Sequence, residues 1–209
     1  RKDVLYSLFF LLSVIYYLKF ISEQSGKGLM IGLSILFFLL SILSKPAAVC
    51  LPGVVILIDW FKGRKLSRTL IIEKIPFIAI SIVFGIVAIN SQKEIGAIQN
   101  LAPLFSFLQR ILLSFYALML YIVKFIVPTG LSAMHPYPDL SIGGVAAKVY
   151  ASPAIVVLLL AIAVWSVKKN RTVLFCTLFF LVNIALVLQI LPVGAAIIAE
   201  RYTYLPSFG

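Results

Sequence analysis

The segment LSILSKPAAVCLPGVVILIDWFKGRK, residues 40–65, decides the fold because it places a lysine and a proline inside a long apolar run. The run extends from Leu29 to Phe61. As one helix rising about 1.5 Å per residue, it would far exceed the roughly 30 Å hydrocarbon core of a bilayer. A residue that precedes proline is disfavoured in the helical conformation. Lys45-Pro46 therefore predicts a break, and we expect a helical hairpin with Lys45 at one membrane face.

The composition of the whole chain indicates an integral membrane protein. Of its 209 residues, 62% are hydrophobic and 12% are charged, whereas a soluble domain is about half apolar and about a quarter charged. The net charge of +11 does not indicate nucleic-acid binding, because excess Lys and Arg mark the cytoplasmic loops of membrane proteins. The sequence has no metal-ligand cluster, glycine-rich phosphate loop or soluble catalytic triad.

We predict an all-α, polytopic transmembrane bundle of about six spans and one further helix. The predicted spans are Val4–Ser22, Leu29–Ser44, Ala47–Phe61, Pro76–Asn90, Ala151–Val167 and Thr172–Pro192.

Basic residues orient these spans, because they gather in two predicted loops. The loops hold Lys62, Arg64, Lys65, Arg68 and Lys74 in one case, and Lys168, Lys169 and Arg171 in the other. The positive-inside rule places both loops in the cytoplasm. Lys45 then lies on the exoplasmic side, together with Asp3 and Arg201. Asp59, at the cytoplasmic end of its helix, is expected to be solvated or paired with a lysine.

A further apolar segment, Leu104–Val127, is predicted not to cross the membrane as a single pass. A crossing there would give an odd number of passes between the two cytoplasmic loops. The polar residues of the segment form one stripe along a helix, which holds Ser106, Arg110, Ser114, Tyr121 and Lys124. Such a pattern suits a helix that lies in the interface or folds back into the protein.

Charged and aromatic residues on the exoplasmic face form the candidate site. Lys45 is either a solvated turn lysine whose ammonium reaches the headgroups or a residue that faces a cavity and pairs with an anion. Arg201 carries a planar guanidinium suited to phosphate, and the adjacent Tyr202 and Tyr204 suit a sugar or a headgroup. The alternative is an aromatic anchor at the membrane surface in which Arg201 pairs with Glu200.

The lone histidine, His135, lies in the segment MHPYPD, residues 134–139. Pro136 and Pro138 fix the backbone around it. His135 is therefore held on a stiff loop, where its role is either structural or catalytic.

Four segments resemble, in their order and spacing, the bacterial relatives of the transmembrane and tetratricopeptide-repeat O-mannosyltransferases. They are SKPAAVCLPGVVILIDW at 44–60, EKIPFIAISIV at 73–83, HPYPD at 135–139 and AERYTYLPSFG at 199–209. The resemblance covers nearly the whole chain, and SKP and RYTYLP are its most specific parts. The membrane domain of that family is of the GT-C glycosyltransferase type.

The resemblance implies a transferase that moves mannose or another hexose from a polyprenyl-phosphate-sugar to a hydroxyl of a protein or glycan. The site would face the outside of a bacterial inner membrane. Residues 1–209 would form an internal part of one GT-C-like transmembrane domain. The first exoplasmic loop would precede them, and the last helices and tetratricopeptide repeats would follow. The catalytic base is expected in that first loop, upstream of Arg1, so no residue here is assigned to it.

The predicted site therefore lacks its base but contains the residues expected to hold the donor. Lys45 and Arg201 are assigned to the donor phosphate, and the residues assigned to the lining are His135, Tyr137, Tyr202 and Tyr204. The expected partners are the lipid bilayer, the lipid-linked sugar donor and a protein or glycan acceptor. No cofactor is assigned, and a requirement for a divalent metal is left open.

Two other functions make different predictions. A transporter of lipid-linked sugars predicts inverted repeats and helices broken at mid-membrane, whereas the sequence shows no internal repeat and its break at Lys45 lies at a membrane face. A non-catalytic membrane scaffold is compatible with these residues, because the loop that would carry the base lies upstream of Arg1.

Overall fold

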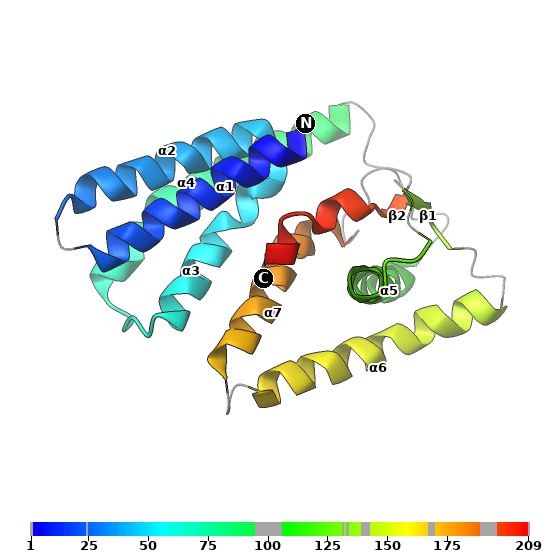
Figure 1. Ribbon diagram of the computed structural model, residues 1–209. Helices are drawn as coiled ribbons and strands as arrows, with labels where there is room; N and C mark the ends of the chain where they lie inside the picture. The colour runs from blue at the N-terminus through cyan, green and yellow to red at the C-terminus, as the bar shows by residue number, and fades with distance from the viewer. Residues whose placement is uncertain are drawn as a thin grey trace. The chain divides into compact units, whose positions relative to one another are not determined.

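Helices account for most of the residues that the computed structural model describes (Figure 1). The described residues are 2–23, 25–94, 106–130, 132, 134–138, 143–166, 170–188 and 196–208. The α-helices are α1 (Lys2–Ser22), α2 (Lys27–Ser44), α3 (Leu51–Phe61), α4 (Arg68–Glu94), α5 (Phe107–Ile126), α6 (Gly143–Ser166) and α7 (Arg171–Ile184). The shorter elements are the 3-10 helices η1 (Pro46–Cys50), η2 (Ala185–Val187), η3 (Glu200–Thr203) and η4 (Pro206–Phe208) and the strands β1 (His135–Pro136) and β2 (Ala196–Ile198).

Among the described residues, five helices are long and apolar enough to cross a membrane. They are α1, α2, α4, α5 and residues 146–166 of α6. Two shorter apolar helical segments, Pro46–Phe61 and Arg171–Val187, correspond to the two remaining predicted spans. The prediction of a mainly helical protein with several helices fit to span a membrane is confirmed. The short β1–β2 pair was not predicted.

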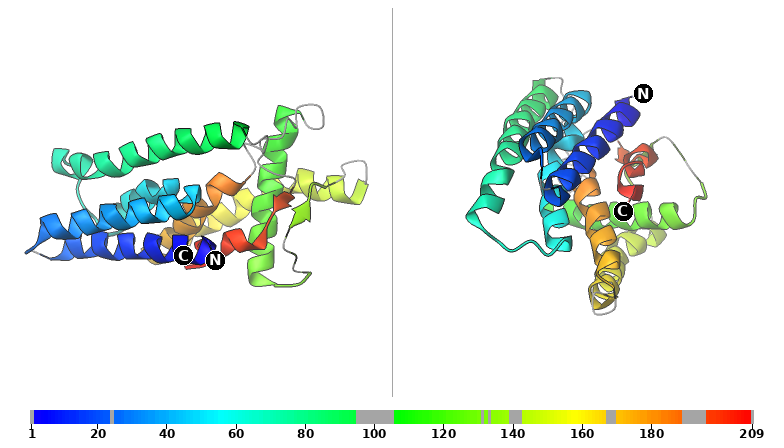
Figure 2. Two further views of the ribbon diagram at one scale, coloured as in Figure 1. Left: turned by 90° about the horizontal axis from the view of Figure 1, so that it is seen from above. Right: turned by 60° about the vertical axis from the view of Figure 1, so that its left-hand side comes forward.

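The chain divides into two compact units, Arg1–Ser91 and Gln92–Gly209. In unit 1, α1 and α2 form an antiparallel hairpin, α4 runs alongside them, and α3 is inclined to all three (Figures 1 and 2). The ring of Phe77 on α4 packs against Tyr17 of α1 and Phe38 of α2, with centroids 6.0 and 5.8 Å apart. These aromatic contacts form the core that joins the hairpin to α4.

Small polar residues let α1 and α2 approach closely. The hydroxyl of Ser13 donates to the carbonyl of Ser34 over 2.7 Å, and the hydroxyl of Ser34 donates to the carbonyl of Ser13 over 2.8 Å. A third buried hydroxyl, that of Ser41, donates to the carbonyl of Tyr6 over 2.9 Å. Serine at a helix contact combines a small side chain with a hydrogen bond, as is common between membrane helices.

The break at Lys45-Pro46 is present as the sequence predicted. α2 ends at Ser44, and Lys45 is extended, with φ −157° and ψ 126°. Its backbone N–H still donates to the carbonyl of Ser41 over 3.0 Å, so α2 ends without a buried unpaired donor. Pro46 then begins η1, which leads directly into α3.

The start of α4 differs from the prediction. The helix begins at Arg68 and continues through Pro76 to Glu94, so Arg68 and Lys74 belong to the helix rather than to the loop before it. The predicted span Pro76–Asn90 is therefore too short at both ends. The physical reason at the start is that Lys74 is buried against Asp59, and a paired cation need not lie in water.

In unit 2, α6 begins before the predicted Ala151 and passes through Pro153. Proline cannot donate to the carbonyl one turn earlier, which belongs to Val149. The hydroxyl of Ser152 donates to that carbonyl over 2.7 Å. This bond satisfies a buried backbone acceptor and allows the helix to continue.

The last predicted span, Thr172–Pro192, is shorter in the structure. α7 ends at Ile184, and η2 continues the turn as far as Val187. Apolar composition predicted that a helix was present here but did not predict where it ends. Pro192 lies outside the described residues.

The helix α5 crosses α6 steeply. Figure 1 looks almost along the axis of α5 while α6 lies across the page, and the left view of Figure 2 shows the same crossing from above. The polar stripe predicted for α5 does not face water throughout, because Ser114 and Tyr121 are buried. That this segment does not cross the membrane as a single pass stays a prediction, because α5 is itself one of the helices long and apolar enough to cross. The hydroxyl of Tyr121 accepts a hydrogen bond from the backbone N–H of Ala199 over 3.1 Å.

Candidate functional site

A two-stranded antiparallel ribbon brings two of the sequence motifs together in unit 2. β1 belongs to HPYPD and β2 directly precedes ERYTYLP, with His135 opposite Ile198 and Pro136 opposite Ala196. Pro136 and Pro138 favour the extended backbone that β1 needs. Ile197 and Ile198 are buried in the core of this unit. The ribbon therefore fixes both motifs on one apolar support.

Glu200 is the polar centre of this arrangement. One carboxylate oxygen, Oε1, accepts a hydrogen bond from the backbone N–H of Ser132 over 2.9 Å and lies 3.1 Å from Nε2 of His135. The ammonium of Lys124, at the end of α5, lies 3.6 Å from the same oxygen. The backbone N–H of Ser132 is the main cause that lowers the pKa of Glu200, and His135 and Lys124 lower it further against the opposing effect of partial burial. The sequence predicts Glu200 only as a partner for Arg201, and these three contacts of Glu200 depend on residues distant in the sequence.

The predicted donor-binding residue Arg201 is exposed and lies beside Glu200 on η3. Its guanidinium lies over the ring of Tyr202, 5.2 Å from the centroid. Tyr202 and Tyr137 both pack against the core of the unit, and burial raises the pKa of the Tyr137 hydroxyl. Tyr204 is more exposed and meets Phe208 edge to face, with centroids 6.1 Å apart. The structure thus gathers five predicted site residues, His135, Tyr137, Arg201, Tyr202 and Tyr204, in one part of unit 2.

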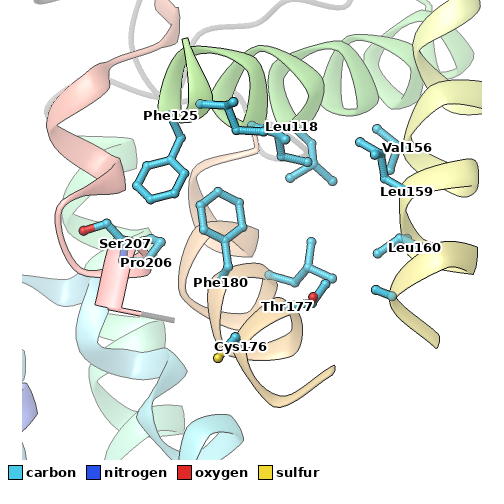
Figure 3. A pocket seen from close by; sticks show the side chains of 14 residues that line it. Leu118, Phe125, Val156, Leu159, Leu160, Cys176, Thr177, Phe180, Pro206 and Ser207 are labelled. Carbon is cyan, nitrogen blue, oxygen red and sulfur yellow. The ribbon is translucent and has the colours of Figure 1, made fainter. Parts of the chain in front are cut away.

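An apolar cavity of about 320 Å³ lies beside this segment, between α5, α6, α7 and η4. Figure 3 shows the rings of Phe125 and Phe180 directed into the same space from α5 and α7, with Val156 and Leu159 opposite them on α6. Pro206 and Ser207, from the segment that also carries Arg201, form one wall. The cavity can therefore hold an apolar chain of a ligand whose polar end lies near that segment.

Lys45, the other predicted phosphate ligand, lies in unit 1. Its ammonium pairs with the carboxylate of Asp3 at the start of α1 and lies 5.6 Å from the centroid of the Tyr6 ring. Lys45 and Asp3 therefore lie at the same end of the α1–α2 hairpin, as the sequence predicted. Because Lys45 and Arg201 belong to different units, the proposal that they hold the same phosphate stays a prediction.

A buried ionic cluster at the other end of unit 1 was not predicted as a group. Asp59 is only 3% exposed, and its Oδ2 lies 2.5 Å from Nζ of Lys74. The hydroxyl of Tyr17 lies 2.8 Å from Oδ1 of Asp59 and also accepts a hydrogen bond from Lys74. Of the two alternatives stated for Asp59, the lysine-paired one is present, and the solvated one is wrong. The sequence did contain an indication of this buried pair, because Asp59 and Lys74 both adjoin apolar runs.

Arg64 joins this cluster to the loop between α3 and α4. Its guanidinium donates to both carboxylate oxygens of Glu73 over 2.9 and 3.1 Å and to Asp59 over 2.9 Å. The hydrogen bonds to Glu73 are the main cause that raises the pKa of Arg64. The cluster balances two carboxylates against two cations, which is the arrangement expected of a structural ion network that joins α1, α3 and α4.

Within the described part of the chain, no three His, Cys, Asp or Glu side chains lie close enough together to hold a metal ion. Asp139, the remaining acidic residue of the HPYPD segment, lies outside that part.

No protein-family model, curated protein or solved structure matches the chain.

Proposed function

We propose that this protein is a membrane glycosyltransferase that moves a sugar from a polyprenyl-phosphate donor to a hydroxyl of a protein or glycan. The observation that carries the proposal is the pairing of HPYPD with the segment that begins ERYTYLP. These are two of the four segments on which the family resemblance rests, and the contact between His135 and Glu200 joins residues 65 positions apart. The site would face the outside of a bacterial inner membrane.

In the proposed reaction, the oxygen of the acceptor hydroxyl attacks the anomeric carbon of the donor sugar. The bond from that carbon to the phosphate oxygen breaks, the polyprenyl phosphate departs with the electron pair, and a base takes the hydroxyl proton. Arg201 supports this assignment, because an exposed guanidinium stacked on Tyr202 suits the developing phosphate charge. The neighbouring cavity of about 320 Å³ would hold part of the polyprenyl chain.

Glu200 is not proposed as the base. Its carboxylate accepts a backbone hydrogen bond and lies beside two basic side chains, and the lowered pKa makes it a weak proton acceptor. We assign it a positioning role, in which it holds the start of η3 and thereby Arg201. No residue of this chain is assigned to the base.

The test is transfer by the full-length protein in liposomes that contain radiolabelled polyprenyl-phosphate sugars and a candidate acceptor. Label should move to the acceptor. Arg201→Leu should lower the rate of label transfer about 30- to 1,000-fold, which is the effect of losing one charged contact to the transition state. Arg201→Lys should retain part of the rate. Movement of intact labelled lipid across the bilayer would instead identify a transporter. If label is not transferred and labelled lipid does not cross the bilayer with any donor tested, the result would support a non-catalytic membrane scaffold.

A further inference from the structure

A groove in unit 1 is separate from every residue assigned to the transfer reaction. It has a volume of about 560 Å³ and is lined by α1, α2, α4 and the loop before α4. Its volume falls within the range of about 300–1,000 Å³ that is usual for small-molecule sites. The groove therefore has room for part of a ligand.

The lining changes from polar to apolar along the helices. On α2 the lining residues are Lys27, Ile31 and Ile35, which follow at intervals of one helical turn. On α4 they include Thr69 at the start and Ile72 in the next turn. Arg64 and Glu73 also line the groove and are paired with each other. Lys27 and Thr69 lie at the starts of α2 and α4, here called the mouth of the groove, and the isoleucines of the lining follow them along each helix.

The charge at the mouth is positive. Asp59 and Glu73 are already paired with Lys74 and Arg64. Four further basic residues at this end are exposed and make no ion pair within the described part of the chain, namely Lys27, Lys62, Lys65 and Arg68. Glu23, at the end of α1, is the nearest remaining carboxylate in sequence to Lys27. The mouth therefore favours an anion.

An exposed apolar residue in the same basic loop indicates where this end lies relative to a bilayer. Leu66 is 85% exposed and follows Lys65. Basic residues beside an exposed leucine are typical of a segment at the boundary between headgroups and acyl chains. The helices α1, α2 and α4 that line the groove are all long and apolar enough to cross a membrane, so we expect a ligand of the groove to come from the membrane.

We propose that this groove binds an anionic phospholipid. The phosphate lies at the mouth against Lys27 and the hydroxyl of Thr69, and one acyl chain follows Ile31, Ile35 and Ile72. Arg64 and Glu73 also line the groove, but they are paired within the charge-balanced cluster, so Arg64 is not counted as a ligand of the phosphate. A basic pocket between membrane helices is suited to such a lipid. Inorganic phosphate would leave the apolar walls unused, and a zwitterionic lipid would not match the charge.

The test uses the purified protein in detergent with added phosphatidylglycerol or phosphatidylcholine, and native mass spectrometry measures the lipid retained. The unsubstituted protein should retain phosphatidylglycerol in preference to phosphatidylcholine. Lys27→Gln should weaken this retention about fivefold, the effect of one lysine near a lipid headgroup, and Lys27→Arg should preserve it. Lys65→Gln is the matched control, because Lys65 carries the same charge at the same end but does not line the groove. It should weaken retention clearly less than Lys27→Gln does.

A second variant tests the apolar part of the groove without changing its charge. Ile31→Trp should block the acyl chain and reduce phosphatidylglycerol retention, with size-exclusion chromatography and circular dichroism showing that the protein remains folded. Ile35→Trp serves the same purpose if Ile31→Trp does not fold. Equal losses in Lys65→Gln and Lys27→Gln would show a general surface-charge effect and overturn the proposal. Normal retention in the folded tryptophan variant, or displacement of the lipid by inorganic phosphate, would overturn it as well.

Discussion

Nε2 of His135 lies 3.1 Å from Oε1 of Glu200, across the β1–β2 ribbon and 65 residues away in the sequence. Glu200 begins η3, and Arg201 follows it directly. The position of the residue proposed to hold the donor phosphate therefore depends on a loop from a distant part of the chain. This contact couples two of the four segments that carry the resemblance, and it leads to the first prediction.

Stability should fall at low pH through Glu200. The pKa of this carboxyl is lowered in the folded protein. Its contribution is therefore fully present above the ordinary glutamate pKa of about 4.3 and is lost as the pH falls through the lower folded value. Glu200→Gln should remove this part of the pH dependence, measured as the difference in Tm between pH 7 and pH 3.5. Glu23→Gln, at an exposed carboxylate, is the control and should keep the pH dependence of the unsubstituted protein. An unchanged pH profile in Glu200→Gln would contradict the prediction.

Lys45 should affect transfer by its charge rather than by its pairing with Asp3. If it stabilises the departing phosphate, Lys45→Met should slow transfer about 30- to 1,000-fold, and Lys45→Arg should retain part of the rate. Asp3→Asn removes the ion pair but keeps the lysine, so its rate should stay near normal. Equal losses in Lys45→Met and Asp3→Asn would show that the ion pair acts only on structure. The measurement is the initial rate of label transfer in liposomes.

The buried cluster should be sensitive to the loss of one partner. Asp59→Asn leaves the buried ammonium of Lys74 with only the more distant carboxylate of Glu73, 3.7 Å away, and the loss of the close partner should cost about 3–5 kcal/mol. For a protein of this size, that corresponds to a fall in Tm of about 6–20 °C. The double variant Asp59→Asn, Lys74→Met should recover much of the loss. Asp3→Asn, at the more exposed pair with Lys45, should cost only about 0–1 kcal/mol. A small effect of Asp59→Asn would show that water reaches the cluster.

Both ends of α5 should lie on the same side of the membrane. Single cysteines at Phe107 and Thr129, in a background without the free thiols Cys50 and Cys176, should both react with an impermeant thiol reagent added outside. The motive is the steep crossing of α5 over α6 (Figures 1 and 2), together with the parity of the basic loops. Cysteines at Lys2 and Leu66 serve as references and should lie outside and inside, respectively. Reaction of only one of the two α5 probes would mean that the helix crosses.

Local sequence features predicted most of the helical framework. The break at Lys45 follows from the restriction that Pro46 places on the residue before it, and that restriction acts between neighbours. The apolar runs indicated helices at α1, α2 and α6 because membrane-type helices have a long and unmistakable composition. The same reasoning failed at the start of α4. Lys74 was assigned to a basic loop because its burial depends on Asp59 and Tyr17, which are distant in the sequence.

The sequence by itself determined that the chain forms apolar helices, that it breaks at Lys45, and which polar residues were candidates for the site. Tertiary structure decided which of those residues meet. A ribbon as short as β1–β2 has too few residues for a strand pattern, and in the folded protein its residues Ile197 and Ile198 are buried in the core. The carboxylates of Asp59 and Glu200 likewise received their partners through packing. Hydrophobic burial and charge pairing between distant segments depend on the folded arrangement, whereas proline geometry and helix composition act locally along the chain.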